Sequence, residues 1–96
     1  MKTLDNVSID DVKSKVSDVI VYGDGDTFAL LCKASSKAQG WMKSTKVCNV
    51  PGGCLIQVTT QQTNPDGSYA VAEAITYCPN VWLDHTANPR RLLPCP

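Results

Sequence analysis

Two hairpin turns between strand-forming runs constrain the fold of this chain more than any other feature. Residues 64–67 read Asn-Pro-Asp-Gly, a type I turn in which glycine is free to adopt the left-handed conformation. Residues 51–53 read Pro-Gly-Gly and also supply turn geometry. The runs beside the turns, 41–50, 54–62 and 69–77, are rich in apolar and β-branched residues. The sequence therefore predicts an antiparallel meander.

The run after the second turn alternates between two kinds of side chain. One face carries large groups around a single acid, namely Tyr69, Val71, Glu73, Ile75 and Tyr77, and the other carries small ones, namely Ala70, Ala72, Ala74, Thr76 and Cys78. Small residues let another layer approach closely, so this pattern predicts a central strand packed on both sides.

The first segment predicts a short helix. Ser8 is a suitable N-cap, and Asp11 occupies the third position of a capping box. Ile9, Val12 and Val16 form one apolar stripe at helical spacing. A helix of about two turns is stable only when it docks on something.

Further strands are expected at 19–22, 27–33, 41–50 and 81–83, with Leu92 and Leu93 pairing back. The 96 residues make one domain, with a helical segment at 1–17, an antiparallel meander at 18–83 and an irregular tail at 84–96. The predicted class is α+β and β-rich, with five or six strands. Such a sheet is expected to curl into a small barrel or to cover one face with the helix.

Composition narrows the class of partner. Nine Lys and Arg balance nine Asp and Glu, so the chain has no overall field that would favour nucleic acid. No apolar run reaches the roughly 18 residues of a membrane span. The N-terminal residues lack the apolar core of a secretion signal. We therefore expect a cytoplasmic protein without a membrane or nucleic-acid partner.

The chain contains five cysteines, at positions 32, 48, 54, 78 and 95, and an odd count without a secretion signal favours free thiols. There is no Cys-x-x-Cys pair and only one histidine, His85, so zinc at Cys48, Cys54, Cys78 and His85 is a minor alternative. A disulfide between Cys48 and Cys54 across the first hairpin stays open. No cofactor is predicted.

Catalysis is not expected. His85 is the only imidazole and lies in a polar, proline-bounded segment, and the chain has only one Glu. Residues 23–26, Gly-Asp-Gly-Asp, lack the remaining ligands of a calcium loop and are interpreted as a turn.

Charge is segregated along the chain. No acid lies between residues 27 and 65, whereas four lysines and a tryptophan do, so the candidate partner-binding residues are Lys33, Lys37, Trp41, Lys43 and Lys46. The alternative interpretation is a solvated strand face that discourages edge-to-edge aggregation.

The segments 40–46, 50–54, 57–62 and 66–74 resemble small uncharacterised proteins of tailed bacteriophages and prophages. The resemblance covers about residues 18–82. It implies an origin and no particular chemistry, and no catalytic residues follow from it.

Three functions are therefore considered. The first is a non-enzymatic phage accessory protein that binds and inhibits a host bacterial protein, such as a defence factor, in the host cytoplasm. The second is a virion component that stabilises the capsid or completes the head. The third is a module that sequesters a nucleotide signal in a crevice of a homo-oligomer, lined by lysines and Trp41.

Overall fold

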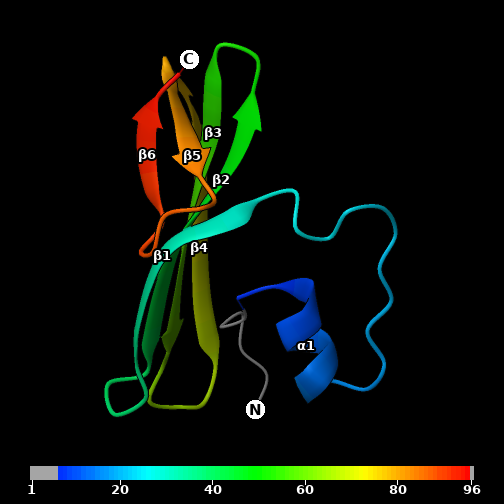
Figure 1. Ribbon diagram of the computed structural model, residues 1–96. Coiled ribbons are helices and arrows are strands. Elements are labelled where there is room, and N and C mark those ends of the chain that lie inside the picture. The colour runs from blue at the N-terminus through cyan, green and yellow to red at the C-terminus, as the bar shows by residue number, and fades with distance from the viewer. Residues whose placement is uncertain (1–6, 96) are drawn as a thin grey trace.

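The computed structural model describes residues 7–95 as an α+β, β-rich fold (Figure 1). Its elements are α1 (Ile9–Lys15), β1 (Ala29–Ser36), β2 (Trp41–Val50), β3 (Gly53–Thr63), β4 (Tyr69–Pro79), β5 (Val81–Asp84) and β6 (Arg91–Pro94). The first four strands form an antiparallel sheet in the order β1-β2-β3-β4, and β5 and β6 form a separate hairpin. The larger sheet does not close into a barrel.

Both predicted hairpin turns are confirmed. Val50 pairs with Gly53 across the first turn and Thr63 pairs with Tyr69 across the second. Gly52 has φ +80° and Gly67 has φ +87°, a conformation that glycine adopts without steric cost. The local turn chemistry therefore sets where β2, β3 and β4 begin and end.

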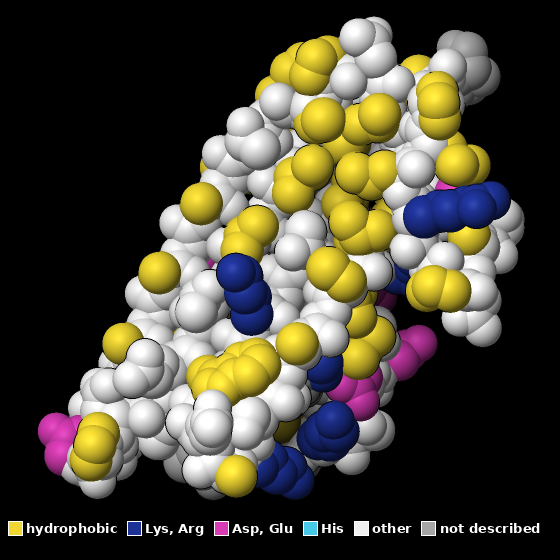
Figure 2. Space-filling model, turned by 90° about the vertical axis from the view of Figure 1, so that its left-hand side faces the viewer, with side chains coloured by type: hydrophobic (Ala, Val, Ile, Leu, Met, Phe, Trp, Pro, Cys, Tyr) yellow, Lys and Arg dark blue, Asp and Glu magenta, His cyan; other side chains and the backbone are white. Residues whose placement is uncertain are grey.

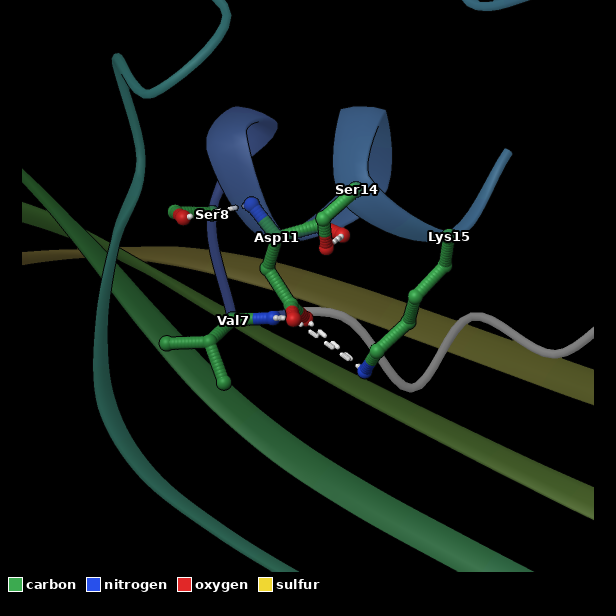
Figure 3. Close-up of polar contacts among 5 residues, drawn as sticks. All are labelled: Val7, Ser8, Asp11, Ser14 and Lys15. Carbon is green, nitrogen blue, oxygen red and sulfur yellow. Dashed lines mark hydrogen bonds and ion pairs between the residues drawn. The ribbon is translucent and has the colours of Figure 1, made fainter. Parts of the chain in front are cut away.

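The predicted helix and its cap are also confirmed. The Ser8 hydroxyl accepts a hydrogen bond of 3.2 Å from the Asp11 amide. The Asp11 carboxylate accepts from the Val7 amide and pairs with Lys15 one turn later (Figure 3). The hydrogen bond from Val7, followed by the contact with Lys15, lowers the pKa of Asp11.

The helix is fastened to the loop that follows it. The amide of Ile9 donates to the Asp26 carboxylate at 2.9 Å, and the Ile9 side chain lies against Gly25. Asp24 accepts from the amide of Asp26, as the predicted turn at 23–26 requires. None of the residues of α1 is fully buried.

The strand predicted at 19–22 is wrong. These residues have no regular secondary structure, and Ile20 and Tyr22 are almost completely exposed. The next strand begins at Ala29, two residues later than predicted. β-Branched and aromatic composition supports a strand only where a neighbouring strand completes the hydrogen bonds, and none does so here.

The core lies between the β5–β6 hairpin and one end of the sheet. Val47, Cys54 and Leu83 are its buried centre. The side-chain amide of Asn49 donates to the Leu83 carbonyl and its oxygen accepts from the Leu83 amide, and the indole of Trp82 donates to the Val50 carbonyl. These bonds fix the hairpin over β2 and β3.

The C-terminal tail is more regular than predicted. The short strand predicted at 81–83 is confirmed as β5. The segment 84–96, predicted to be irregular, contains β6, in which Leu92 and Leu93 pair back as expected.

The predicted position of the last meander strand is wrong. β4 is an edge strand of the four-stranded sheet, and all of its residues except Cys78 are exposed. Its apolar-and-small pattern indicates two surfaces that can be packed, but within residues 7–95 neither surface is covered.

Candidate functional site

The candidate partner-binding residues lie on two opposite faces of the sheet. Because side chains alternate along a strand, Trp41 and Lys43 of β2 point to the face that also carries the buried Val47. We call this the open face, because β5 and β6 cover only its Val47 end. Lys46 points to the opposite face.

The open face presents Trp41 and Lys43 next to short side chains. Trp41 pairs with Ser36 and Gln62, and its indole N–H donates to the Gln39 side chain at 3.3 Å. Lys43 lies between Ala34 of β1 and Thr60 of β3, both exposed. Trp41 is 40% exposed even though β2 is an inner strand. Large apolar area at this position is available to a partner.

The other predicted lysines lie elsewhere. Lys33 pairs with Ser44 and so belongs to the opposite face, together with the half-buried Lys46. Lys37 lies in the turn between β1 and β2. The structure thus brings Trp41 and Lys43 together and does not gather all five residues on one surface.

The view from the side of β5 and β6 agrees with this distribution (Figure 2). Hydrophobic side chains gather over the upper half of that side, whereas some Lys and Arg side chains lie close together near its lower end, next to Asp and Glu side chains.

Sequence reasoning missed the exposed apolar row on β4. Tyr69, Val71, Ile75 and Tyr77 are between 37% and 59% exposed and share one face. Glu73 lies within this row and accepts a 3.1 Å hydrogen bond from the Thr59 hydroxyl of β3. The alternation is visible in the sequence, but there it predicts a strand that is packed on both sides.

The cysteines are all free. Cys48 pairs with Leu55 and Cys54 pairs with Asn49, so the two thiols point to opposite faces and the disulfide considered between them does not form. Burial raises the pKa of the Cys54 thiol, with smaller contributions from neighbouring cysteines. A thiol that resists ionisation is a weak nucleophile.

Polar groups that could suggest chemistry are engaged in turns. The Asp84 carboxylate accepts from the hydroxyl and the amide of Thr86, and these bonds lower its pKa. His85 beside it is exposed in the β5–β6 turn. Among residues 7–95 no three His, Cys, Asp or Glu side chains are grouped so that they could hold a metal ion.

The only helix in the described part of the chain has seven residues, and no helix there is long and apolar enough to cross a membrane.

Comparison with known proteins places the chain in a family. No curated protein and no solved structure matches it. The model of the Lockin family matches residues 1–93, which is nearly the whole chain. The chain therefore belongs to the Lockin family.

Proposed function

We propose that this chain is a non-enzymatic phage accessory protein that binds and inhibits a host bacterial protein in the host cytoplasm, with a defence factor as the expected class of target. The sequence resemblance over about residues 18–82 supports the proposed phage origin. The binding role is supported by the exposed side chains on the open face.

The observation that carries the proposal is the exposure of Trp41 next to Lys43. Tryptophan is enriched among the residues that dominate binding energy at protein interfaces. An indole that is 40% exposed on an inner strand presents apolar area that would lose contact with water when a partner covers it. The small neighbours Ala34 and Thr60 would let that partner approach closely.

The charge on this face indicates an acidic protein surface as the partner. Lys43 is exposed beside Trp41, and the described residues of β2 and its neighbours β1 and β3 carry no acid. An acidic partner would gain a complementary charge at the edge of the tryptophan contact. The balanced net charge of the chain does not favour nucleic acid.

Affinity capture from host lysate, with variants of each face, tests this proposal. Trp41→Ala and Lys43→Glu should each remove the captured target, whereas Lys46→Glu, the same charge reversal on the opposite face, should leave it in place. Circular dichroism of each variant controls for folding. An identical set of captured proteins for wild type and for Lys43→Glu would contradict the proposal.

The proposed location is tested separately. A protein that acts in the cytoplasm should be absent from purified virions. Its presence there in stoichiometric amounts, measured by mass spectrometry, would instead support the virion component considered above.

A nucleotide-sequestering module is the second candidate, and the spacing of Trp41 and Lys43 on one face favours it. An indole can stack on a base while an ammonium group two residues along the strand contacts a phosphate. A thermal-shift screen with nucleotides would detect such a ligand, since at 100 times its dissociation constant it adds about 2.7 kcal/mol. The shift should disappear in Trp41→Ala, and a shift that survives this change would place the ligand elsewhere.

A further inference from the structure

The free side of β4 has a defined hydrogen-bonding pattern. The amide of Asn80 donates to the carbonyl of Gly52, and the amide of Asn64 donates to the carbonyl of Ser68, at the two ends of the β3–β4 ladder. In an antiparallel pair, hydrogen-bonded and non-hydrogen-bonded residues alternate. The even-numbered residues of β4 therefore bond to β3, while the odd-numbered ones direct their amide and carbonyl groups away from the sheet.

These outward groups form an edge without the usual protection. The odd-numbered positions are Tyr69, Val71, Glu73, Ile75, Tyr77 and Pro79, and only the last lacks an N–H. The β3–β4 register is continuous over eleven residues with no bulge. At about 3.4 Å per residue the edge is roughly 37 Å long. Edge strands normally carry lysines, prolines or bulges that prevent further pairing.

Only one charge lies on this strand, and it is held over the sheet. Glu73 is the single ionisable acid or base among Asp, Glu, Lys, Arg and His in residues 69–79. Its carboxylate accepts from the Thr59 hydroxyl of the neighbouring strand. The carboxylate is therefore drawn toward β3 and does not block the free edge.

We propose that a second copy of this chain pairs with β4 in antiparallel orientation about a two-fold axis at Ala74, so that one sheet runs through both copies. This register places Val71 opposite Tyr77 and Glu73 opposite Ile75 of the other copy. Both pairs join outward-directed residues, so their amide and carbonyl groups bond reciprocally. Ala74 lies opposite its own symmetry mate.

β4 is self-complementary when the axis lies at Ala74, and it is not when the axis is moved to Glu73 or Ile75. Val71 against Tyr77 is a β-branched–aromatic pair, a combination that stabilises sheets. The two ends match, because Tyr69 lies opposite Pro79. An axis at Glu73 would place two carboxylates directly opposite each other, which is destabilising. An axis at Ile75 would leave Tyr69 and Ala70 unpaired.

The small core is a second reason for a second copy. Only Met42, Val47, Cys54 and Leu83 are buried hydrophobic residues among those described. Chains of this length bury a smaller share of their surface than larger domains do, and binding a partner subunit adds stability. Val71 and Ile75, which are 51% and 59% exposed, lie where the second copy would cover them in part.

Light scattering on the full chain gives the first test. The wild type should be a dimer at tens of micromolar concentration. Ile75→Pro removes an outward N–H and leaves the β3 ladder intact, so the dimer should weaken by about thirty-fold or more. Ile20→Pro, the same change at a site that is 95% exposed, should remain dimeric. A monomeric wild type, or an Ile75→Pro dimer of wild-type affinity, would overturn the proposal.

Cysteine cross-linking gives a second test that does not depend on a disruptive substitution. In the proposed register the two Ala74 Cα atoms lie about 4.5 Å apart, which a disulfide can span. Ala74→Cys should form a covalent dimer under mild oxidation. Ala72→Cys should not, because its two copies are offset by four residues, roughly 13 Å along the strands. Equal cross-linking by both variants, or none by Ala74→Cys, would rule out this pairing.

This inference goes beyond the proposed function and is independent of it. The surface of Trp41 and Lys43 is two strands away from the β4 edge. Failure of the dimer tests would leave host-protein binding in place, and failure of the capture experiment would leave the dimer in place.

Discussion

The two edge strands of the four-stranded sheet, β1 and β4, differ in whether they are protected against pairing with a further strand. At the β1 edge, the Arg90 guanidinium donates to the Leu30 carbonyl at 2.9 Å, and the register with β2 shifts between Leu30 and Cys32. A bulge and a bound cation both discourage another strand from pairing. The β4 edge has neither device. The comparison teaches that one sheet can be terminated on one side and extendable on the other.

The difference arises from a distant part of the chain. Arg90 is sixty residues away from Leu30 in sequence and reaches it because the β5–β6 hairpin packs over the sheet. The hairpin thus protects β1 and leaves β4 uncovered. The predictions below test this asymmetry from the largest expected effect to the smallest.

Removing the anchor of the hairpin should have the largest effect on the monomer. Leu83 is 3% exposed and packs with Val47 and Cys54, so Leu83→Ala should lower the free energy of unfolding by about 2–5 kcal/mol. Urea denaturation measures this loss. Leu93→Ala, a truncation of a half-buried residue in the same hairpin, should cost less. Equal losses would show that Leu83 does not anchor the hairpin.

Removing the guanidinium group that bonds to β1 should have a smaller effect. Arg90→Ala removes one exposed hydrogen bond to the Leu30 carbonyl, worth about 1 kcal/mol or less. The amides of β1 should exchange faster with deuterium, and the protein should aggregate more readily. Arg91→Ala in β6 is the matched control and should change β1 exchange little. No difference between the two variants would refute the protective role of Arg90.

Removing the charge of Glu73 should strengthen the proposed dimer at the β4 edge. In the proposed dimer the two Glu73 side chains lie diagonally across the new strand pair, so Glu73→Gln should tighten the dimer by a few-fold. The amide oxygen can still accept from Thr59. Sedimentation at low and high salt separates charge from packing, because only the wild type should gain affinity from screening. A Gln variant with the same salt response as the wild type would contradict the register.

The smallest effect should be a pH-dependent loss of stability when Asp84, which precedes the turn with Arg90, is replaced. Hydrogen bonds from Thr86, and Arg91 more weakly, lower the pKa of Asp84 in the folded state. The stability that this provides is present above the unfolded pKa, about 3.9, and is lost as pH falls through the lower folded value. Asp84→Ala should therefore melt a few degrees below wild type at pH 6, and the gap should close in strong acid. A gap that is constant with pH would mean that the carboxylate charge is irrelevant.

Local chemistry made the turns and the helix cap predictable. Gly52 and Gly67 adopt the left-handed conformation that their turns require, and Ser8 caps α1 as its position indicates. Each of these features depends on residues within a few positions of one another. The antiparallel order of β2, β3 and β4 follows from them, because short turns leave a strand no other neighbour.

Long-range pairing explains the errors. The run 19–22 has strand composition but lacks a partner, and the strand at 69–79 has a two-sided pattern but lies at the edge. Neither fact is encoded nearby in the sequence, since both depend on which surfaces the rest of the chain can cover.

The candidate site was partly predictable for the same reason. The opposite directions of Lys43 and Lys46 follow from their spacing within one strand. The face of Lys33 requires in addition the register of β1 against β2, which places Lys33 opposite Ser44. The gathering of Lys33 with Lys46, away from Trp41, is thus a product of the folded sheet.

The sequence by itself determined the cap, the turns and the hairpin register, because backbone dihedral preferences and hydrogen bonds act over a few residues. The tertiary structure decided which strand lies at each edge and which face the β5–β6 hairpin covers. Burial and edge protection depend on surfaces that meet only after distant segments have packed, so no local pattern could have specified them.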